Sequence, residues 1–244
     1  MRIKILSCLI ACTCASIFFM DTAAAQQYQV QDSFARLIPL ANTFSKILVT
    51  DGISLIYNQS EEKGLAVSAT SEALINNIDV VVVGDTLKIG LKKYLGSGKL
   101  KPEYKVYASS SACNYIFAKD AARVIVLGKL ATDSLIITAS SASKINVDLK
   151  VRSLVMNLSS ASFAQLNGEC KNAIIHLNEA SRLMASNLKI NRASINAKAA
   201  SKVWLSVKEE CEIFADGASR IYLQGQPIIR KKRLNGSSRL IIRN

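Results

Sequence analysis

The chain has 244 residues, of which 50% are apolar and only 6% aromatic, and its formal net charge is +13. This length suffices for one large all-β domain or two small ones, and three prolines and eleven glycines exclude a collagen-like or disordered chain. The charge favours anionic neighbours such as nucleic acid, lipopolysaccharide or acidic glycans, although net charge of either sign also serves solubility.

The N-terminus has the pattern of a secretory signal. Arg2 and Lys4 precede the apolar segment 5–20, and the small residues 23–25 form a cleavage site. We therefore expect residues 1–25 to be a signal peptide and the mature protein to be exported, to the periplasm, the outer-membrane surface or the medium, without a transmembrane segment. Export argues against a dedicated nucleic-acid role.

Six cysteines are present, and three of them lie in the predicted signal. One of these, Cys12, ends a lipoprotein box, so lipidation at Cys12 is the alternative to simple cleavage. The remaining Cys113, Cys170 and Cys211 are odd in number and lack metal-site spacing. They indicate small buried fillers, with at most one disulfide bridge.

Residues 26–110 are predicted to be a β-rich region without a copy of the repeat that follows. Two segments, Phe44–Gln59 and Ile78–Lys93, have the strand–turn–strand pattern, with turns at Asp51-Gly52 and Gly84-Asp85.

Two further segments of this region are distinctive. Ser71–Ile78 predicts a short helix or turn. The basic stretch Lys92–Lys105, rich in glycine and lysine, is the candidate for a mobile loop or domain joint, and its lysines indicate a solvated face.

Residues 111–244 repeat a corner of two small residues and a serine at intervals of about 19 residues. The serines are Ser143, Ser162, Ser181, Ser201, Ser219 and Ser238. Positions two and four residues after each serine are apolar, and those between are mixed and mostly polar, so two short strands per unit are expected. Recurrence of one residue type at one offset predicts stacking of the units. The expected fold is all-β, a parallel β-helix or solenoid with rungs of about 19 residues, spaced about 4.8 Å apart.

The corner serines are predicted to have a structural role. Their hydroxyls can donate and accept, so we expect a hydrogen-bonded ladder along the stack. Six equivalent serines argue against a catalytic one. In the last unit, Arg230 and Lys232 occupy positions that are apolar elsewhere, which predicts a solvent-facing C-terminal cap. The segment Ile228–Leu234 is alternatively an anion-binding run.

The ordered pattern resembles a known bacterial family. The segments "FSKILVTDGISLIY" and "ALINNIDVVVVGDTLKIGL", followed by serial corners and "GQPIIRKKRLNGSSRLIIR", are similar to the DUF2807 family of auto-transporter adhesin head GIN domains, over roughly residues 44–243. The resemblance implies an exported β-helical protein and brings no functional residues. Family corners usually have Ser-Gly-Ala-Ser. Here the glycine is present at Gly217 and Gly236, and the replacements are Ser141, Ser160, Glu179 and Ala199.

The sequence gives no catalytic constellation, no metal motif and no cofactor motif. His176 is the only histidine and lies at an outward offset, where a surface polar residue is expected. Glu209, Glu210 and Glu212 form the densest carboxylate group and indicate a solvated turn. Because no unit stacks acidic residues in one column, as a β-helical lyase or hydrolase requires, we expect a non-enzyme.

One column remains as the candidate site. The residues directly after the corners are basic in six of seven units, interrupted by Phe163. The candidate binding residues are Lys144, Arg182, Lys202, Arg220 and Arg239, with Arg123 at the start of the column. Two interpretations stay open: a cationic ridge that meets anionic glycan or lipopolysaccharide, or long stems that cover apolar sheet edges.

The expected function is an exported cell-envelope module for binding or adhesion, whose partner is an anionic glycan, lipopolysaccharide or an envelope protein. The alternatives are a purely structural or assembly module and a carbohydrate-active β-helical enzyme. No cofactor is expected.

Overall fold

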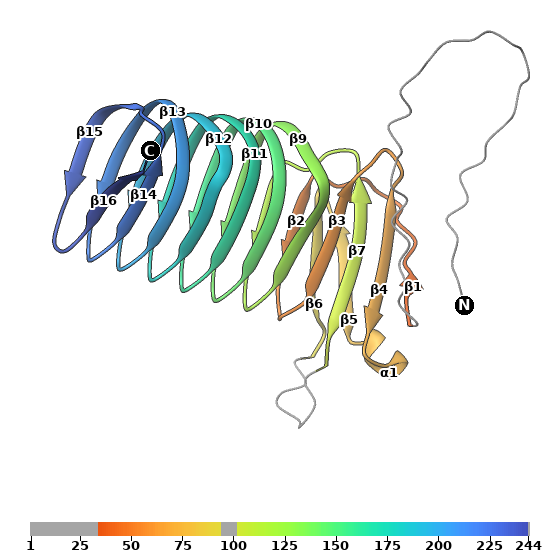
Figure 1. Cartoon of the computed structure of the whole chain (residues 1–244). Helices are drawn as coiled ribbons and strands as arrows, with labels where there is room; N and C mark the ends of the chain where they lie inside the picture. Colours follow the sequence, from red (N-terminus) through yellow and green to blue (C-terminus); the bar gives the residue numbers. More distant parts are fainter. Residues whose placement is uncertain (1–33, 94–101, 244) are drawn as a thin grey trace, which may run out of the picture.

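The computed structural model describes residues 34–93 and 102–243 (Figure 1). The predicted signal peptide, its Cys12 and the centre of the basic Lys92–Lys105 stretch lie outside these residues. The described chain forms sixteen strands in one continuous sheet, with one short helix. The part of the chain that the structure describes contains no helix long and apolar enough to cross a membrane.

The central part is a stack of five long strands. They are β9 (Arg123–Ala139), β10 (Lys144–Leu158), β11 (Phe163–Leu177), β12 (Arg182–Ala197) and β13 (Lys202–Ala215). Each bends along its length, so the stack has two walls, and each pairs in parallel with the strands before and after it (Figure 1). The prediction of a parallel solenoid with rungs of about 19 residues is confirmed. The two short strands expected per unit are instead one continuous bent strand.

Parallel register explains the repeat length. Lys144 pairs with Phe163, and Phe163 pairs with Arg182, at steps of 19 residues. Small irregularities in register lie at the bend between the two walls. One of them accommodates Gly168, whose φ is +104° and where a Cβ would approach the Leu149 carbonyl oxygen to 2.0 Å. The bend therefore requires glycine on this rung.

The stack ends in a divided rung formed by β14 (Arg220–Gln224) and β15 (Ile228–Leu234), followed by a partial rung formed by β16 (Arg239–Arg243). β14 and β15 pair in parallel with the two halves of β13, and β16 pairs with β14. Arg230 and Lys232 are exposed. This confirms the predicted solvent-facing last rung, since Lys232 continues a column that Ile213 fills on the preceding rung.

The stack begins before the first unit of the repeat that the sequence shows. β2 (Lys46–Val49) pairs in parallel with β8 (Tyr115–Ala118), and β3 (Ser54–Gln59) pairs in parallel with β9. Segment 44–59 is therefore not a hairpin: its strands lie on opposite walls and meet at a corner formed by Asp51 and Gly52, both with positive φ. The repeat pattern in the sequence does not reveal this corner, because Ile53 occupies the position where later corners have serine.

Antiparallel strands close the N-terminal end. β5 (Ile78–Val83) and β6 (Thr86–Leu91) form the predicted hairpin, and β6 pairs with β2. On the other wall, β7 (Tyr104–Ser110) pairs in parallel with β3. β4 (Gly64–Ala69) pairs antiparallel with β7, and β1 (Arg36–Leu37) pairs antiparallel with β4. The helix α1 (Glu72–Ile75) lies within the segment predicted to be a helix or turn. These elements cover the first rung (Figure 1).

The core lies between the walls and consists of aliphatic columns. Inward residues two positions after the corners are almost completely buried: Val124, Ile145, Ala164, Leu183, Val203 and Ile221. Burying a side chain of valine or leucine size contributes about 1.5–3 kcal/mol. Cys113, Cys170 and Cys211 are free and buried, as expected. Burial raises the pKa of the Cys113 thiol to about 12 and that of Cys170 and Cys211 to about 11, so these thiols are unreactive.

Candidate binding surface

The column after the corners is continuous in space. Arg123 pairs with Lys144, Lys144 with Phe163, and the register continues to the last rung through the remaining cations, Arg182, Lys202, Arg220 and Arg239. We call these six basic residues the cation column. Five of them are exposed and Lys202 is half-buried. Upstream, Ser54 occupies the same register position on β3.

The cation column is not neutralised by the protein. Within residues 34–93 and 102–243, no ion pair or side-chain hydrogen bond involves any of its six members. Like charges about one rung apart repel by about 1 kcal/mol per neighbouring pair in water, and by less in salt. The half-buried Phe163 separates Lys144 from Arg182 and relieves this repulsion once.

Three carboxylates near the end of the solenoid form ion pairs with cations outside the column. Arg192 pairs with Glu209 at 3.1 Å, Arg230 with Glu210 at 2.6 Å, and Lys231 with Glu212 at 3.0 Å; these ion pairs link neighbouring rungs. The guanidinium of Arg230 holds the pKa of Glu210 below its usual value. The acidic group noticed in the sequence therefore consists of surface ion pairs, and no set of three or more metal-ligating side chains occurs among the described residues.

A second outward column lies beside the cation column, two residues further along each strand. Trp204 and Tyr222 stack in parallel planes with ring centroids 4.7 Å apart, and the guanidinium of Arg243 lies 5.2 Å from the Tyr222 centroid. The period-two pattern places both rings outside but gives no sign that they stack. Their faces are occupied by each other and by Arg243, so the rings stabilise the last rungs.

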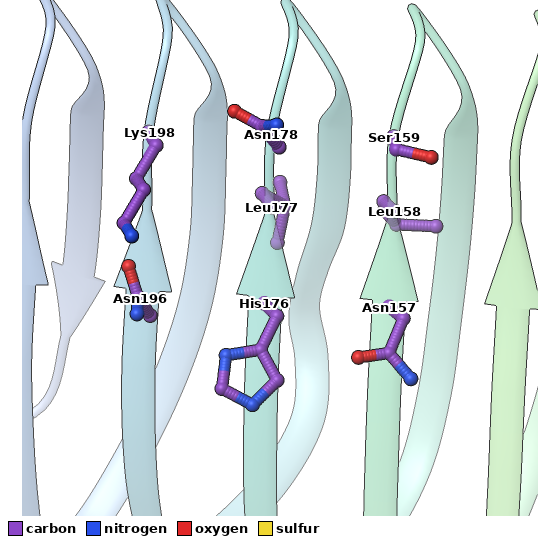
Figure 2. Close-up of a pocket in the computed structure, with 8 residues that line it drawn as sticks. All are labelled: Asn157, Leu158, Ser159, His176, Leu177, Asn178, Asn196 and Lys198. Carbon is purple, nitrogen blue, oxygen red and sulfur yellow. The ribbon is translucent and has the colours of Figure 1, made fainter.

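The other wall carries a shallow pocket of about 310 Å³ beside the corners. Figure 2 shows its lining as two rows of side chains on three neighbouring strands, β10, β11 and β12. One row consists of Asn157, His176 and Asn196, and the other of Ser159, Asn178 and Lys198. The sequence placed His176 correctly at an outward position with asparagines at the same offset. It did not show that the second row lies alongside, because that depends on the geometry of the corner.

The sequence profile of a protein family described as "Putative auto-transporter adhesin, head GIN domain" matches residues 43–227. The chain belongs to this family, DUF2807. The fold is similar to a "putative adhesin" from Bacteroides fragilis, with 21% identity, a TM-score of 0.74 and coverage of 85% of this chain and 94% of that one. A "putative adhesin" from Parabacteroides merdae has 16% identity, a TM-score of 0.69 and coverage of 86% and 95%.

A third similar structure is a "putative lipid binding protein" from Parabacteroides distasonis, with 17% identity, a TM-score of 0.66 and coverage of 86% of this chain and 96% of that one. At these identities the likenesses establish the DUF2807 fold alone. A comparison with curated proteins gives no match.

The corner that separates the cation column from the pocket is a tight turn with two central residues of positive φ, as in a type I′ turn. DUF2807 corners usually place glycine first, yet Ser160, Glu179 and Ala199 adopt φ of 52°, 53° and 49°, close to the 60° of Gly217. Hydrogen bonds between rungs hold them: the N–H of Ala161 donates to the Glu179 carbonyl at 2.8 Å. The stack thus imposes the glycine geometry on other residues.

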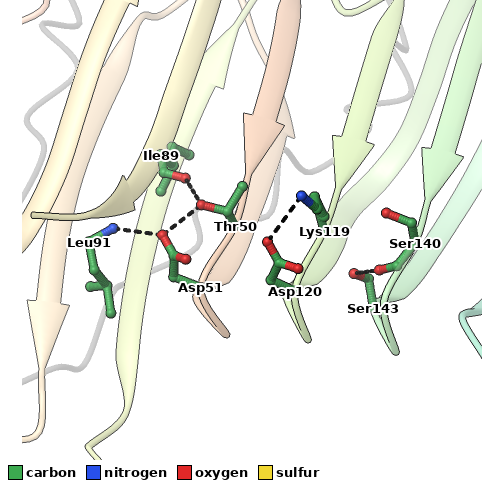
Figure 3. Close-up of polar contacts among 8 residues, drawn as sticks. All are labelled: Thr50, Asp51, Ile89, Leu91, Lys119, Asp120, Ser140 and Ser143. Carbon is green, nitrogen blue, oxygen red and sulfur yellow. Dashed lines mark hydrogen bonds and ion pairs between the residues drawn. The ribbon is translucent and has the colours of Figure 1, made fainter. Parts of the chain in front are cut away.

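The buried corner serines bind main-chain carbonyls. The hydroxyl of Ser143 donates to the carbonyl of Ser140 three residues earlier (Figure 3), and Ser201 and Ser219 make the equivalent bonds at 2.6 and 2.7 Å. Ser162 donates instead to a carbonyl of the preceding rung. The predicted hydrogen-bonded ladder of hydroxyls is therefore wrong: the hydroxyls donate to main-chain carbonyls, of their own turn or, for Ser162, of the preceding rung.

At the first corner a carboxylate accepts hydrogen bonds, in place of a serine hydroxyl that donates one. Asp51 Oδ2 accepts hydrogen bonds from Thr50 Oγ1 at 2.7 Å and from the Leu91 amide at 3.0 Å (Figure 3). This ties the corner to β6 of the closing hairpin.

Proposed function

We propose that this DUF2807 protein is an exported, non-catalytic binding module of the cell envelope. In this proposal the cation column contacts an anionic ligand, either an acidic glycan or the phosphorylated part of lipopolysaccharide. The observation that carries the proposal is the register of six cations, five of them exposed and one half-buried, on a common face without a carboxylate partner among the described residues.

Three features support an anionic ligand. Arg152, Arg192, Arg230 and Lys231 pair with carboxylates across rungs, whereas among the described residues no member of the cation column does. An extended polyanion placed along the column would neutralise charges that otherwise repel each other. Arginine, which provides most of the column, binds carboxylate and phosphate groups through two parallel hydrogen bonds.

A non-catalytic role is supported by the state of the reactive groups. The acidic cluster is ion-paired, and the thiols are buried with raised pKa values. The corner serines donate to main-chain carbonyls and have no base beside them. The envelope location follows from the predicted signal, and lipopolysaccharide as ligand agrees with the lipid-binding description of one structural neighbour.

The test compares two variants with the same loss of charge. One carries Lys144→Gln, Arg182→Gln, Lys202→Gln and Arg220→Gln in the cation column. The control carries glutamine at four exposed lysines elsewhere, Lys150, Lys171, Lys189 and Lys208. Binding to immobilised lipopolysaccharide and polygalacturonate is measured, with neutral dextran as reference.

At about 1 kcal/mol per cation near an anionic surface, loss of four cations should make the column variant bind about a thousandfold more weakly, and the control variant should bind nearly as well as the unchanged protein. Affinity of the unchanged protein should fall as salt rises. Equal, salt-insensitive retention of both variants contradicts the proposal. In that case a defined protein partner captured by both would favour a structural module, and release of sugar fragments would favour an enzyme.

A further inference from the structure

The pocket on the second wall is lined by uncharged polar side chains and a single cation. Asn157 pairs in register with His176, and His176 with Asn196, so one row presents two amides and an imidazole at successive rungs. The second row, three residues before the corner serines, adds a hydroxyl, an amide and an ammonium group. Figure 2 shows both rows opening to the same side.

These polar groups are not used to hold the fold. In the described part of the chain, the side chains of Asn157, Ser159, His176 and Asn196 form no hydrogen bond with another residue, and Asn196 Oδ1 is buried without a donor. Asn178 is engaged, because its amide donates to Glu179 at 3.2 Å. Of these groups only Asn196 Oδ1 is buried, and a buried acceptor without a donor requires a water molecule or a ligand from outside the chain.

The chemistry of the lining selects among ligand classes. No carboxylate lines the pocket, which argues against a metal ion. Its one cation, Lys198, lies over the ring of Phe214 at 5.5 Å, so a cluster of positive charge for phosphate is missing from the lining. Amide, hydroxyl and imidazole groups both donate and accept, and they match sugar hydroxyls, which do the same.

We propose that the two rows bind a neutral saccharide, with its hydroxyls bonded to Asn157, His176 and Asn196 and its long axis across the three rungs. This site goes beyond the proposed anionic ligand of the cation column, from which the corners separate it. A shallow, open site of this kind fits weak recognition of one or a few sugar units within a longer chain.

The test is an NMR titration of the full mature protein with four neutral oligosaccharides: maltohexaose, cellohexaose, chitohexaose and mannohexaose. We expect at least one of them to shift the side-chain amide signals of Asn157 and Asn196 and the ring signals of His176, with an affinity in the millimolar range. The double variant Asn157→Ala, Asn196→Ala should bind about tenfold more weakly, because two hydrogen bonds to the ligand are lost.

Two controls make the result specific. Thr138→Val removes a polar group from the same column one rung outside the pocket and should leave the affinity unchanged. The glutamine variant of the cation column should also bind the oligosaccharide normally, which separates this site from the proposed function. Absence of pocket shifts with all four sugars, or equal affinity of the double variant, overturns the proposal. So does shifting of the pocket signals by polygalacturonate alone.

Discussion

In β10 to β13 the inward residues at one register position are aliphatic on every rung, whereas outward residues differ between columns. Ile145, Ala164, Leu183 and Val203 follow one another inside, while one residue earlier Lys144, Phe163, Arg182 and Lys202 follow one another outside. An inward side chain must fit the rungs on both sides and the opposite wall, so stacking determines its type. Outward positions are free of this constraint, and their regularity therefore points to function.

The largest difference in stability between inward and outward positions is expected when two neighbouring residues are each replaced by alanine. Leu154 is fully buried and Val155, next to it, is only half-buried. Leu154→Ala should lower the free energy of unfolding by about 3 kcal/mol through lost burial and the cavity left behind. Val155→Ala should lower it by less than about 1 kcal/mol. Urea denaturation of both variants measures the difference, and similar losses would contradict the assignment of inner and outer faces.

The corner serines should show a smaller effect of the same sign. Ser201→Ala removes the shorter of two hydrogen bonds to the carbonyl of Lys198, whose other donor is the Ser201 amide at 3.2 Å, and should cost about 1 kcal/mol. Ser194 is exposed on β12, and its side chain makes no hydrogen bond within the described residues. Ser194→Ala should therefore change the unfolding free energy by less than about 0.5 kcal/mol. If the two substitutions have equal effects in thermal denaturation, the hydroxyl does not stabilise the turn.

Substitution of a corner residue by glycine is expected to raise the free energy of unfolding. Ala199 has a φ of 49°, and Ala199→Gly should stabilise the protein by about 1 kcal/mol because the left-handed conformation is strained for residues with a Cβ. The reverse change on the next rung, Gly217→Ala, should destabilise it by a similar amount. The midpoints of urea unfolding should move in opposite directions; movement in the same direction would show that the stack removes the strain.

The smallest effect is expected from outward ion pairs. Arg152 and Asp133 are both largely exposed and 3.0 Å apart, so Arg152→Ala should change the unfolding free energy by less than about 1 kcal/mol. The same low sensitivity is expected for single glutamine substitutions in the cation column. A large loss of stability there would favour the interpretation that the long stems cover the sheet edges.

Most of the solenoid could be predicted from the sequence, because stacked rungs require an apolar inward residue at the same position of each unit, about every 19 residues. The first corner escaped detection because it keeps the turn geometry with Asp51, Gly52 and Ile53, and without the serine that marks the later corners. A hairpin and a solenoid corner have the same local pattern, and only the pairing partners of β2 and β3 distinguish them.

The candidate site was predictable only in part. The cation column follows from one offset, since residues at that offset must lie side by side once the rungs stack. The pocket requires two offsets, five and three residues before the serine, to face the same side, which depends on how the strand enters the turn. That detail is set by the paired left-handed residues and not by the polarity pattern.

Each rung contacts chiefly the rungs beside it, and this gives the 19-residue unit a further meaning. Duplication of one internal unit would leave every strand with a matching partner and would lengthen the molecule by about 4.8 Å. The same event would add one position to the row of cations. In such a molecule the length of the stack and the number of cations available to an extended ligand increase together, by one rung for each copied unit. The copied unit already fits its neighbours, because it has the same register as the units beside it.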